Sequence, residues 1–245
     1  MISSLFNTLI FQPFYNGFIL LFNLLPFLDA GMIVIIFTIV IKIILLPLSV
    51  KASKSALQMK SIEKDLNAIK EKYKDNKEEQ TKQTLEYYKV NNINPFAGIF
   101  VLLIQLPIII GLYRVFLKSG LPQITKTLLY SFVVAPNPAN IHMLFLGLTN
   151  IADKSIVLAL IAGATTYLQI SLSIGAQQNT GSGKSNDIAR AMNTQMKFIF
   201  PILVVFISYS ISGALALYWI TSNVFSILQE MWIKKKYHKT PPIVI

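Results

Sequence analysis

Residues 30–48 read AGMIVIIFTIVIKIILLPL, an apolar segment with one charged side chain, Lys42, and a proline at its end, Pro47. A helix needs about 20 mostly apolar residues to cross the hydrocarbon core of a bilayer. This segment is close to that length and composition. We therefore predict that it forms a membrane-spanning helix and that the fold is that of an all-α membrane protein.

The composition of the whole chain agrees with this prediction. Of its 245 residues, 53 % are hydrophobic and only 13 % are charged, which is about half of the charged share of an average soluble domain. A soluble chain of this length could not bury so much apolar surface in one core. The sequence contains no cysteine, so disulfides and thiolate chemistry are excluded.

The remaining apolar segments predict four further spans. The stretch from Phe198 to Ile233 is too long for one crossing at about 1.5 Å per residue, so we divide it by a turn at Ser212–Gly213. This division also keeps the lysines after Ile233 on the same side as the other basic loops. The five predicted spans are residues 30–48, 95–117, 155–174, 198–211 and 214–233.

Positive charge predicts the orientation of the spans. The formal net charge is +11, and the segment 51–92 alone holds ten lysines. The tail at residues 234–245 begins with three more lysines. Because lysine between apolar segments marks cytoplasmic loops, we read this charge as topology rather than as nucleic acid binding. The segment 51–92 and the C-terminus are therefore placed in the cytoplasm and the N-terminus outside.

The segment 51–92 has a helical pattern of its own. Apolar residues recur at helical spacing on both sides of a polar break at residues 74–77. Two helices joined by a short turn can pair such faces, so we predict a cytoplasmic helical hairpin. Its paired residues would be Ile62, Leu66, Ile69 and Tyr73 on the first helix, and Leu85 and Tyr88 on the second.

Residues 1–29 precede the first span and have two interpretations. The stretch from Leu5 to Leu28 is largely apolar, so it could form a sixth span. Its polar and helix-breaking residues favour instead an interfacial helix in the headgroup region outside the membrane, which is our prediction. These residues are Asn7, Gln12, Pro13, Asn16, Asn23 and Pro26.

Polar side chains inside the predicted spans are the candidates for a functional site. An ionisable group in hydrocarbon is costly, and Lys42 either snorkels toward the cytoplasmic interface or points into a water-filled cavity. Polar residues of other spans share helix faces, which favours a common cavity over helix–helix hydrogen bonds alone. They are Thr38 beside Lys42, then Gln105, then Thr165, Gln169 and Ser173, and finally Tyr218, Trp219, Ser222 and Asn223.

The predicted spans lack the residues that catalysis would need. No aspartate or glutamate lies deep in a span, and Glu230 lies at the cytoplasmic end of the last one. The sequence also has no phosphate-binding Gly-rich loop, no metal-ligand cluster and no nucleophile with a histidine partner. We expect no enzymatic activity, no cofactor and no metal.

Several short motifs occur in a distinctive order and spacing. They are IIFTIVIKIILLPL (35–48), KASKSA (51–56), EKYK (71–74), NPFAG (94–98), QLPI (105–108), GLY (111–113) and SGALALYW (212–219), followed by Ser222-Asn223 and Gln229. With these motifs the chain resembles the YidC/Oxa1/Alb3 family of membrane protein insertases from about Leu5 to Lys236. The family typically has arginine where this chain has Lys42, and proline where it has Ser212.

The resemblance implies five core helices around a hydrophilic groove that is open to the cytoplasm and to lipid. Lys42 would be the positive residue of this groove, with Gln105 and Trp219 in its wall. With the polar faces described above, the expected groove residues are Lys42, Gln105, Trp219, Thr38, Gln169, Tyr218 and Ser222.

The resemblance also implies a location and partners. The protein would lie in the bacterial inner membrane, bind nascent membrane proteins and membrane lipids, and function as a monomer. A Sec-type translocon and the ribosome are further expected partners.

Two other classes of function remain open at this point. A small multi-pass transporter or channel would also carry polar residues in its spans, although the lone cation and the lack of an inverted repeat argue against it. A scaffold for the assembly of membrane proteins is the other alternative.

Overall fold

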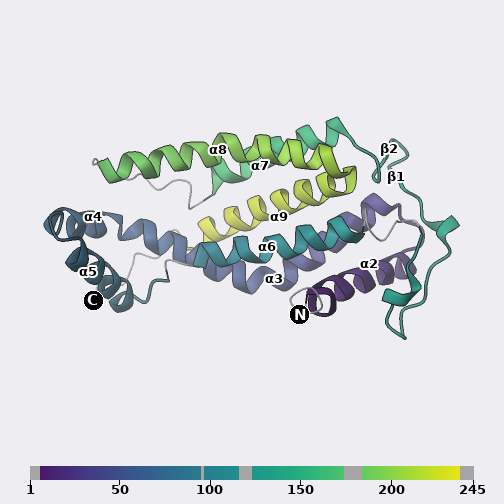
Figure 1. Cartoon of the computed structure of the whole chain (residues 1–245), viewed down its shortest axis with the longest axis horizontal. Coiled ribbons are helices and arrows are strands. Elements are labelled where there is room, and N and C mark those ends of the chain that lie inside the picture. The colour runs from purple at the N-terminus through teal and green to yellow at the C-terminus, as the bar shows by residue number, and fades with distance from the viewer. Residues whose placement is uncertain (1–5, 95–96, 116–122, 174–183, 238–245) are drawn as a thin grey trace.

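The computed structural model describes residues 6–94, 97–115, 123–173 and 184–237. It is mostly helical, as expected of an all-α membrane protein, and its long helices run side by side with alternating direction (Figure 1). They are α3 (Ala30–Ser61), α6 (Ala97–Tyr113), α7 (Ile156–Leu172), α8 (Lys184–Ile211) and α9 (Gly213–Tyr237).

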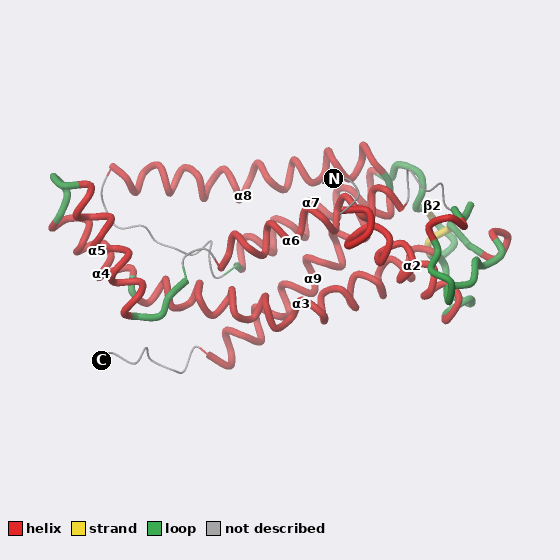
Figure 2. The backbone as a smooth tube through the Cα atoms, turned by 60° about the horizontal axis from the view of Figure 1, so that its bottom comes forward, coloured by secondary structure: helices red, strands yellow, loops and turns green. Residues whose placement is uncertain are grey.

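Opposite ends of this bundle carry different structures (Figure 2). At one end, here called the hairpin end, lie α4 (Glu63–Lys72) and α5 (Lys77–Val90). At the other, called the loop end, the loop between α6 and α7 contacts the starts of α3 and α9. The Ala30 amide donates to the His142 carbonyl at 2.8 Å, and the Ala214 amide donates to the Ile151 carbonyl at 2.8 Å.

In its described part, residues 123–155, the loop at this end contains little regular structure. Two short 3₁₀ turns, η3 (Lys126–Leu128) and η4 (Pro138–Asn140), are followed by a two-stranded antiparallel ladder. The ladder pairs β1 (Leu144–Phe145) with β2 (Thr149–Asn150).

The outer faces of the helices are apolar and exposed. Among the described residues, one helix is long and apolar enough to cross a membrane, Ala30–Met59, and only 22 % of its most apolar window is buried. The shorter apolar helices Ile156–Leu172 and Lys197–Ile211 also expose large aliphatic side chains. Apolar faces of this extent are favourable in lipid and unfavourable in water.

Two helices are longer than the sequence predicted. α3 does not end at Leu48 but continues through Pro47 to Ser61, so it includes the start of the predicted hairpin segment. Proline removes only one backbone hydrogen bond, and helices of membrane proteins tolerate this loss. α8 begins at Lys184, so residues 184–197, which precede the predicted fourth span, are helical. That part has no glycine or proline to stop a helix.

The α4–α5 hairpin has a small apolar core of its own. Ile62, Leu66 and Ile93 are buried there, and Tyr88 packs against them. The predicted role of Leu85 is wrong, because this side chain is 48 % exposed. The pairing face of α5 lies nearer its C-terminal end than the sequence pattern indicated.

A tyrosine–carboxylate contact also joins the two helices of this hairpin. The Tyr87 hydroxyl donates to the Asp65 carboxylate at 2.5 Å. This hydrogen bond raises the pKa of Tyr87 above its ordinary value.

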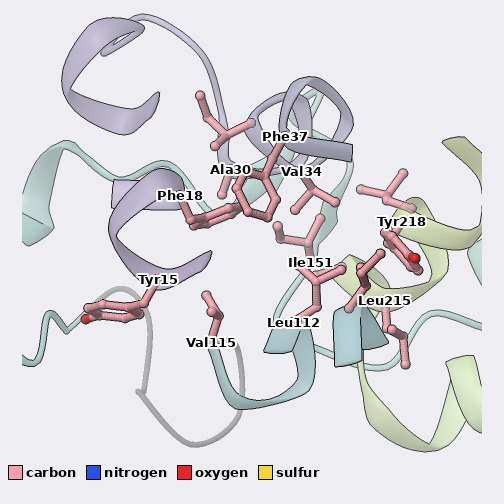
Figure 3. Packing of buried hydrophobic residues seen from close by; sticks show 14 of the residues in the cluster. Tyr15, Phe18, Ala30, Val34, Phe37, Leu112, Val115, Ile151, Leu215 and Tyr218 are labelled. Carbon is pink, nitrogen blue, oxygen red and sulfur yellow. The ribbon is translucent and has the colours of Figure 1, made fainter. Parts of the chain in front are cut away.

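The N-terminal helix packs against the bundle. A π-helical turn, η1 (Asn7–Phe11), leads into α2 (Gln12–Leu24). Its buried face includes Phe18, whose ring meets Phe37 of α3 edge-on with the ring centroids 5.5 Å apart (Figure 3). Such edge-to-face pairs stabilise by more than their buried area alone.

Two of the polar residues of this segment, Asn16 and Asn23, contact the loop between α6 and α7. Asn16 donates to the Leu128 carbonyl at 2.9 Å and accepts from the Tyr130 amide at 2.7 Å. Asn23 donates to the Val134 carbonyl at 2.7 Å. These bonds hold the loop between α6 and α7 against α2, and a single sequence cannot reveal such long-range partners.

Candidate functional site

Lys42 lies inside α3 and faces α9. Its side chain is partly buried, and its Nζ donates to the Ser226 hydroxyl at 3.1 Å. Seven residues further along α3, the Ser49 hydroxyl donates to the Gln229 side-chain carbonyl at 3.0 Å. Polar groups therefore line part of the contact between these two helices.

The α9 residues that take part in these contacts belong to one helix face. Tyr218, Ser222, Ser226 and Gln229 are spaced by four, four and three residues, and we call them the α9 polar stripe. At its loop end the buried Tyr218 hydroxyl accepts a hydrogen bond from Gln105 of α6. Ser222 lies one turn further along α9 and is also buried.

A second polar face of α9 contacts α7. Asn223 donates to the Thr166 hydroxyl at 2.8 Å and to the Thr165 hydroxyl at 3.2 Å. Two turns further on, the Ser173 hydroxyl donates to Glu230 at 3.2 Å. α9 is therefore joined to α3, α6 and α7 by polar side chains.

The predicted groove residues divide into two groups by exposure. Partly exposed are Lys42, Gln105 and Gln169, whereas Thr38, Tyr218, Trp219 and Ser222 are buried. The structure brings Lys42, Gln105, Tyr218 and Ser222 to the α9 polar stripe or its partners. Gln169 lies between Thr165 and Ser173 at a spacing of four, on the face of α7 that contacts α9.

Two of the predicted residues have other surroundings. The Thr38 hydroxyl donates to the Val34 carbonyl of its own helix at 2.7 Å, so this contact links no second helix. Trp219 is buried within the central apolar cluster. Figure 3 shows part of this cluster, where Val34, Leu112 and Leu215 come from three different helices.

Two residues at the site were missed by the sequence analysis. Ser226 is the recorded partner of Lys42, and the spacing of four from Tyr218 to Ser222 leads directly to it. Ser49 follows Lys42 by seven residues, which is two helical turns. Ser226 thus continues a spacing of four that was visible in the sequence, and Ser49 lies on the same face of α3 as Lys42.

The electrostatics of the site are those of a cation with a neutral partner. The contact recorded for Lys42 is to a hydroxyl, and in the described part of the chain no carboxylate pairs with it. Partly exposed glutamines on α6 and α7 add uncharged donors and acceptors. The arrangement is that of a helical membrane protein with one partly buried lysine and several neutral polar side chains between its helices.

Comparison with known proteins gives the family. The model of the 60Kd inner membrane protein family matches residues 21–240. The chain belongs to this family, the YidC/Oxa1/Alb3 family. Its members are inner membrane insertases and chaperones, not enzymes, which agrees with the expectation from the sequence.

Three relatives named "Membrane protein insertase YidC" align over most of the chain. The protein of Fusobacterium nucleatum is 34 % identical over 208 residues, which are 85 % of this chain and 87 % of the relative. That of Clostridium tetani is 32 % identical, with 87 % and 86 % covered. That of Clostridium perfringens is 31 % identical, with 95 % and 89 % covered.

Proposed function

We propose that this protein is a membrane protein insertase that transfers short polar segments and apolar helices of nascent membrane proteins into the bilayer. Its family and the name carried by its relatives support this function over a transporter, a channel or a scaffold. Insertion needs no covalent step, because burial of an apolar helix in lipid is itself favourable.

The proposed path for the polar segment is a hydrophilic groove along the α9 polar stripe, within five membrane-spanning helices. The observation that carries this proposal is Lys42, a partly exposed cation that contacts a hydroxyl instead of a carboxylate. An acidic group of the substrate would find its counter-ion there. Gln105 and Gln169 would supply further hydrogen bonds to a polar segment as it leaves water.

The Lys42 charge is expected to increase the rate of insertion substantially. A carboxylate that enters a medium of low polarity loses several kcal/mol of solvation. If the Lys42 charge restores about 1.4 kcal/mol of this loss at the barrier, insertion becomes about tenfold faster. Water in the groove would also shorten the hydrocarbon path of the segment.

The apolar part of the substrate would leave along the surface of α3. Ile43 and Ile44 follow Lys42 directly and are 55 % and 68 % exposed. Because neighbouring residues of a helix point in different directions, the polar contact and the apolar surface lie side by side on this helix. A substrate can therefore keep its polar segment near Lys42 while its apolar helix meets lipid.

Lysine at position 42 differs from arginine in how easily it loses its charge. Arginine stays charged in any protein environment, whereas a desolvated lysine can lose its proton. We propose that the groove holds enough water to keep Lys42 charged. Arginine at position 42 should then preserve insertion.

The proposed topology follows the positive charge. The loop end faces the outside with the N-terminus and an interfacial α2, and the α4–α5 hairpin and the C-terminus face the cytoplasm. The tail after Ile233 would set this orientation and meet anionic lipid or the ribosome. A Sec-type translocon is a further proposed partner, and a laterally open groove would function in a single copy.

The test is reconstitution of the purified protein into liposomes with a single-span substrate that carries a short acidic tail. Protease protection of the tail measures insertion. We expect insertion by the wild type and by Lys42→Arg, and about tenfold slower insertion by Lys42→Ala. A substrate with a neutral tail is the matched control and should be less affected.

Each negative outcome overturns a different part of the proposal. Equal insertion of several acidic-tailed substrates by Lys42→Ala and the wild type would remove the role of the charge. No insertion above protein-free liposomes by a correctly folded wild type would remove the insertase function.

A further inference from the structure

The β1–β2 hairpin at the loop end presents three leucines to its surroundings. Leu144, Leu146 and Leu148 are 54 %, 63 % and 83 % exposed. Phe145, between the first two, is only partly exposed and packs against the central apolar cluster. The hairpin therefore has one side fixed in the protein and one apolar side free.

The turn of this hairpin has an unusual residue for its conformation. Leu146 and Gly147 have φ angles of 50° and 72°, both in the left-handed region. Asparagine and glycine are the usual residues at such turn positions, and a bulky side chain there is disfavoured. A strained and exposed leucine is best explained if its side chain has a function in the place where the turn holds it.

The hairpin is attached tightly to the first turn of α3. The Asp29 carboxylate accepts from the Met32 amide at 2.8 Å, as a helix N-cap, and from the Leu146 amide at 3.1 Å. The Phe145 ring lies so close to Gly31 that a Cβ at that glycine would be 2.3 Å from it. The leucines are thus held at a fixed height relative to the start of this helix.

The chemistry around the hairpin fits a lipid surface. Residues 141–151 contain no Asp, Glu, Lys or Arg. α7 begins a few residues later, and its first residues Ile156 and Val157 are 51 % and 63 % exposed. Apolar surface is therefore present both on the hairpin and on the adjoining end of a helix that faces lipid.

A cation–aromatic contact lies at the loop end of the bundle, as the hairpin does. The Lys154 ammonium lies 6.0 Å from the centre of the Tyr209 ring, at the start of α7 and near the end of α8. Tyrosine and lysine are typical of the boundary between membrane and water. The hairpin contacts the start of α3, and Ile151, directly after it, contacts the start of α9, so the hairpin is at this boundary.

We infer that the hairpin tip formed by Leu144, Leu146 and Leu148 inserts into the lipid leaflet at the loop end, at the boundary of headgroups and acyl chains. Its partner is the acyl region of phospholipids, and its effect is to fix the depth of α3 in the bilayer. The inference depends on the membrane location of the chain and not on its insertase activity.

The absence of native cysteine makes a direct test possible. The variants Leu148→Cys and Ala139→Cys are labelled with an environment-sensitive fluorophore in the full-length protein and reconstituted into phosphatidylcholine–phosphatidylglycerol vesicles. Ala139 is the matched control, because it is exposed in η4 of the same loop but is not part of the hairpin. Quenching is measured with iodide in the water and with lipids that carry a nitroxide near the headgroup.

We expect the label at position 148 to be quenched several-fold more by the nitroxide lipid than by iodide, relative to position 139. Adding Gly31→Ala to the labelled Leu148→Cys variant should reduce the lipid quenching, because the new methyl group would displace the Phe145 ring and with it the hairpin. A label at 148 that iodide quenches as strongly as the control would place the tip in water and overturn the inference. A label shielded from both quenchers would indicate protein contact, and that result would overturn it as well.

Discussion

The helix pairs α7–α8 and α3–α9 are packed by opposite means. Between α7 and α8 a glycine permits close approach: a Cβ added at Gly163 would lie 2.3 Å from the Val205 side chain and 3.2 Å from the Pro201 carbonyl oxygen. The nearby Ala159 and Ala162 are completely buried. Between α3 and α9, in contrast, Lys42 and Ser49 each reach a polar side chain of the other helix.

This difference in packing predicts that α7–α8 contributes mainly to stability and α3–α9 mainly to insertion. In lipid, helices associate largely through van der Waals contact, which small residues maximise by close approach. The polar side chains between α3 and α9 can instead exchange their protein partners for water or substrate. We therefore expect substitutions at α7–α8 to lower stability and those at α3–α9 to change insertion with little effect on stability.

The largest effect on stability is expected for Gly163→Ala. The new methyl group would overlap Val205 and force the two helices or the side chain to move, which costs about 1–3 kcal/mol. Thermal unfolding in detergent micelles measures the loss. Ala164→Val is the matched control, because the adjacent residue 164 is exposed and its change should stay within about 0.5 kcal/mol.

The double variant Gly163→Ala/Val205→Ala tests the cause. Removal of the opposing methyl groups should recover part of the lost stability, since the two residues are in contact. An unfolding temperature of Gly163→Ala equal to that of the wild type would show that α7 and α8 are not closely packed here, and the comparison would then lose its basis.

The second prediction concerns Asn223→Ala in α9. It tests how much the polar contact between α9 and α7 contributes to stability. The variant loses the hydrogen bonds to Thr165 and Thr166. Both threonine hydroxyls keep the Ala162 carbonyl as a partner, so no new unpaired group arises. The expected loss is about 1 kcal/mol, given an average of about 0.6 kcal/mol for such bonds in membranes. A loss as large as that of Gly163→Ala would reverse our ranking of small residues over polar bonds.

The sequence predicted the helices better than it predicted their surroundings. Apolar length and lysine placement located the helical segments, because both are local properties of the chain. The continuation of α3 through Pro47 and the start of α8 at Lys184 were missed, since proline and charged residues usually indicate the end of a span.

The candidate site was predicted only in part. Polarity within apolar segments identified Lys42 and Gln105, and helical spacing identified Tyr218. The structure joins Lys42 to Ser226 of α9 and Gln105 to Tyr218. The sequence could not show that Tyr218 and Trp219 both lie in the apolar cluster, or that the Tyr218 hydroxyl also accepts from Gln105, because only packing decides these contacts. Long-range partners such as Asp29 with Leu146 leave no periodic signal in one sequence.

A third prediction sharpens the α3–α9 side of the comparison. Ser226→Ala removes the recorded hydroxyl partner of Lys42 and should change stability by less than about 0.5 kcal/mol, because the lysine can bind water in its place. Insertion of an acidic-tailed substrate should fall by less than in Lys42→Ala, since the charge remains. The same liposome assay, together with unfolding in micelles, gives both values. A stability loss above that of Asn223→Ala would mean that this bond is structural.

The smallest effect is expected for Ser49→Ala, at the second α3–α9 contact. The Ser49 hydroxyl donates both to the Leu46 carbonyl of its own helix and to Gln229, at 3.0 Å in each case. A hydroxyl has only one hydrogen, so the two acceptors compete for it and each bond contributes less than a full hydrogen bond. Gln229 remains partly exposed and can turn to water, so we expect a change below about 0.5 kcal/mol in unfolding and no change in insertion. If Ser49→Ala instead slowed insertion as much as Lys42→Ala, the polar contacts would act as one unit that holds α3 to α9. The α3–α9 contact would then stabilise the fold and would not form part of the proposed open groove.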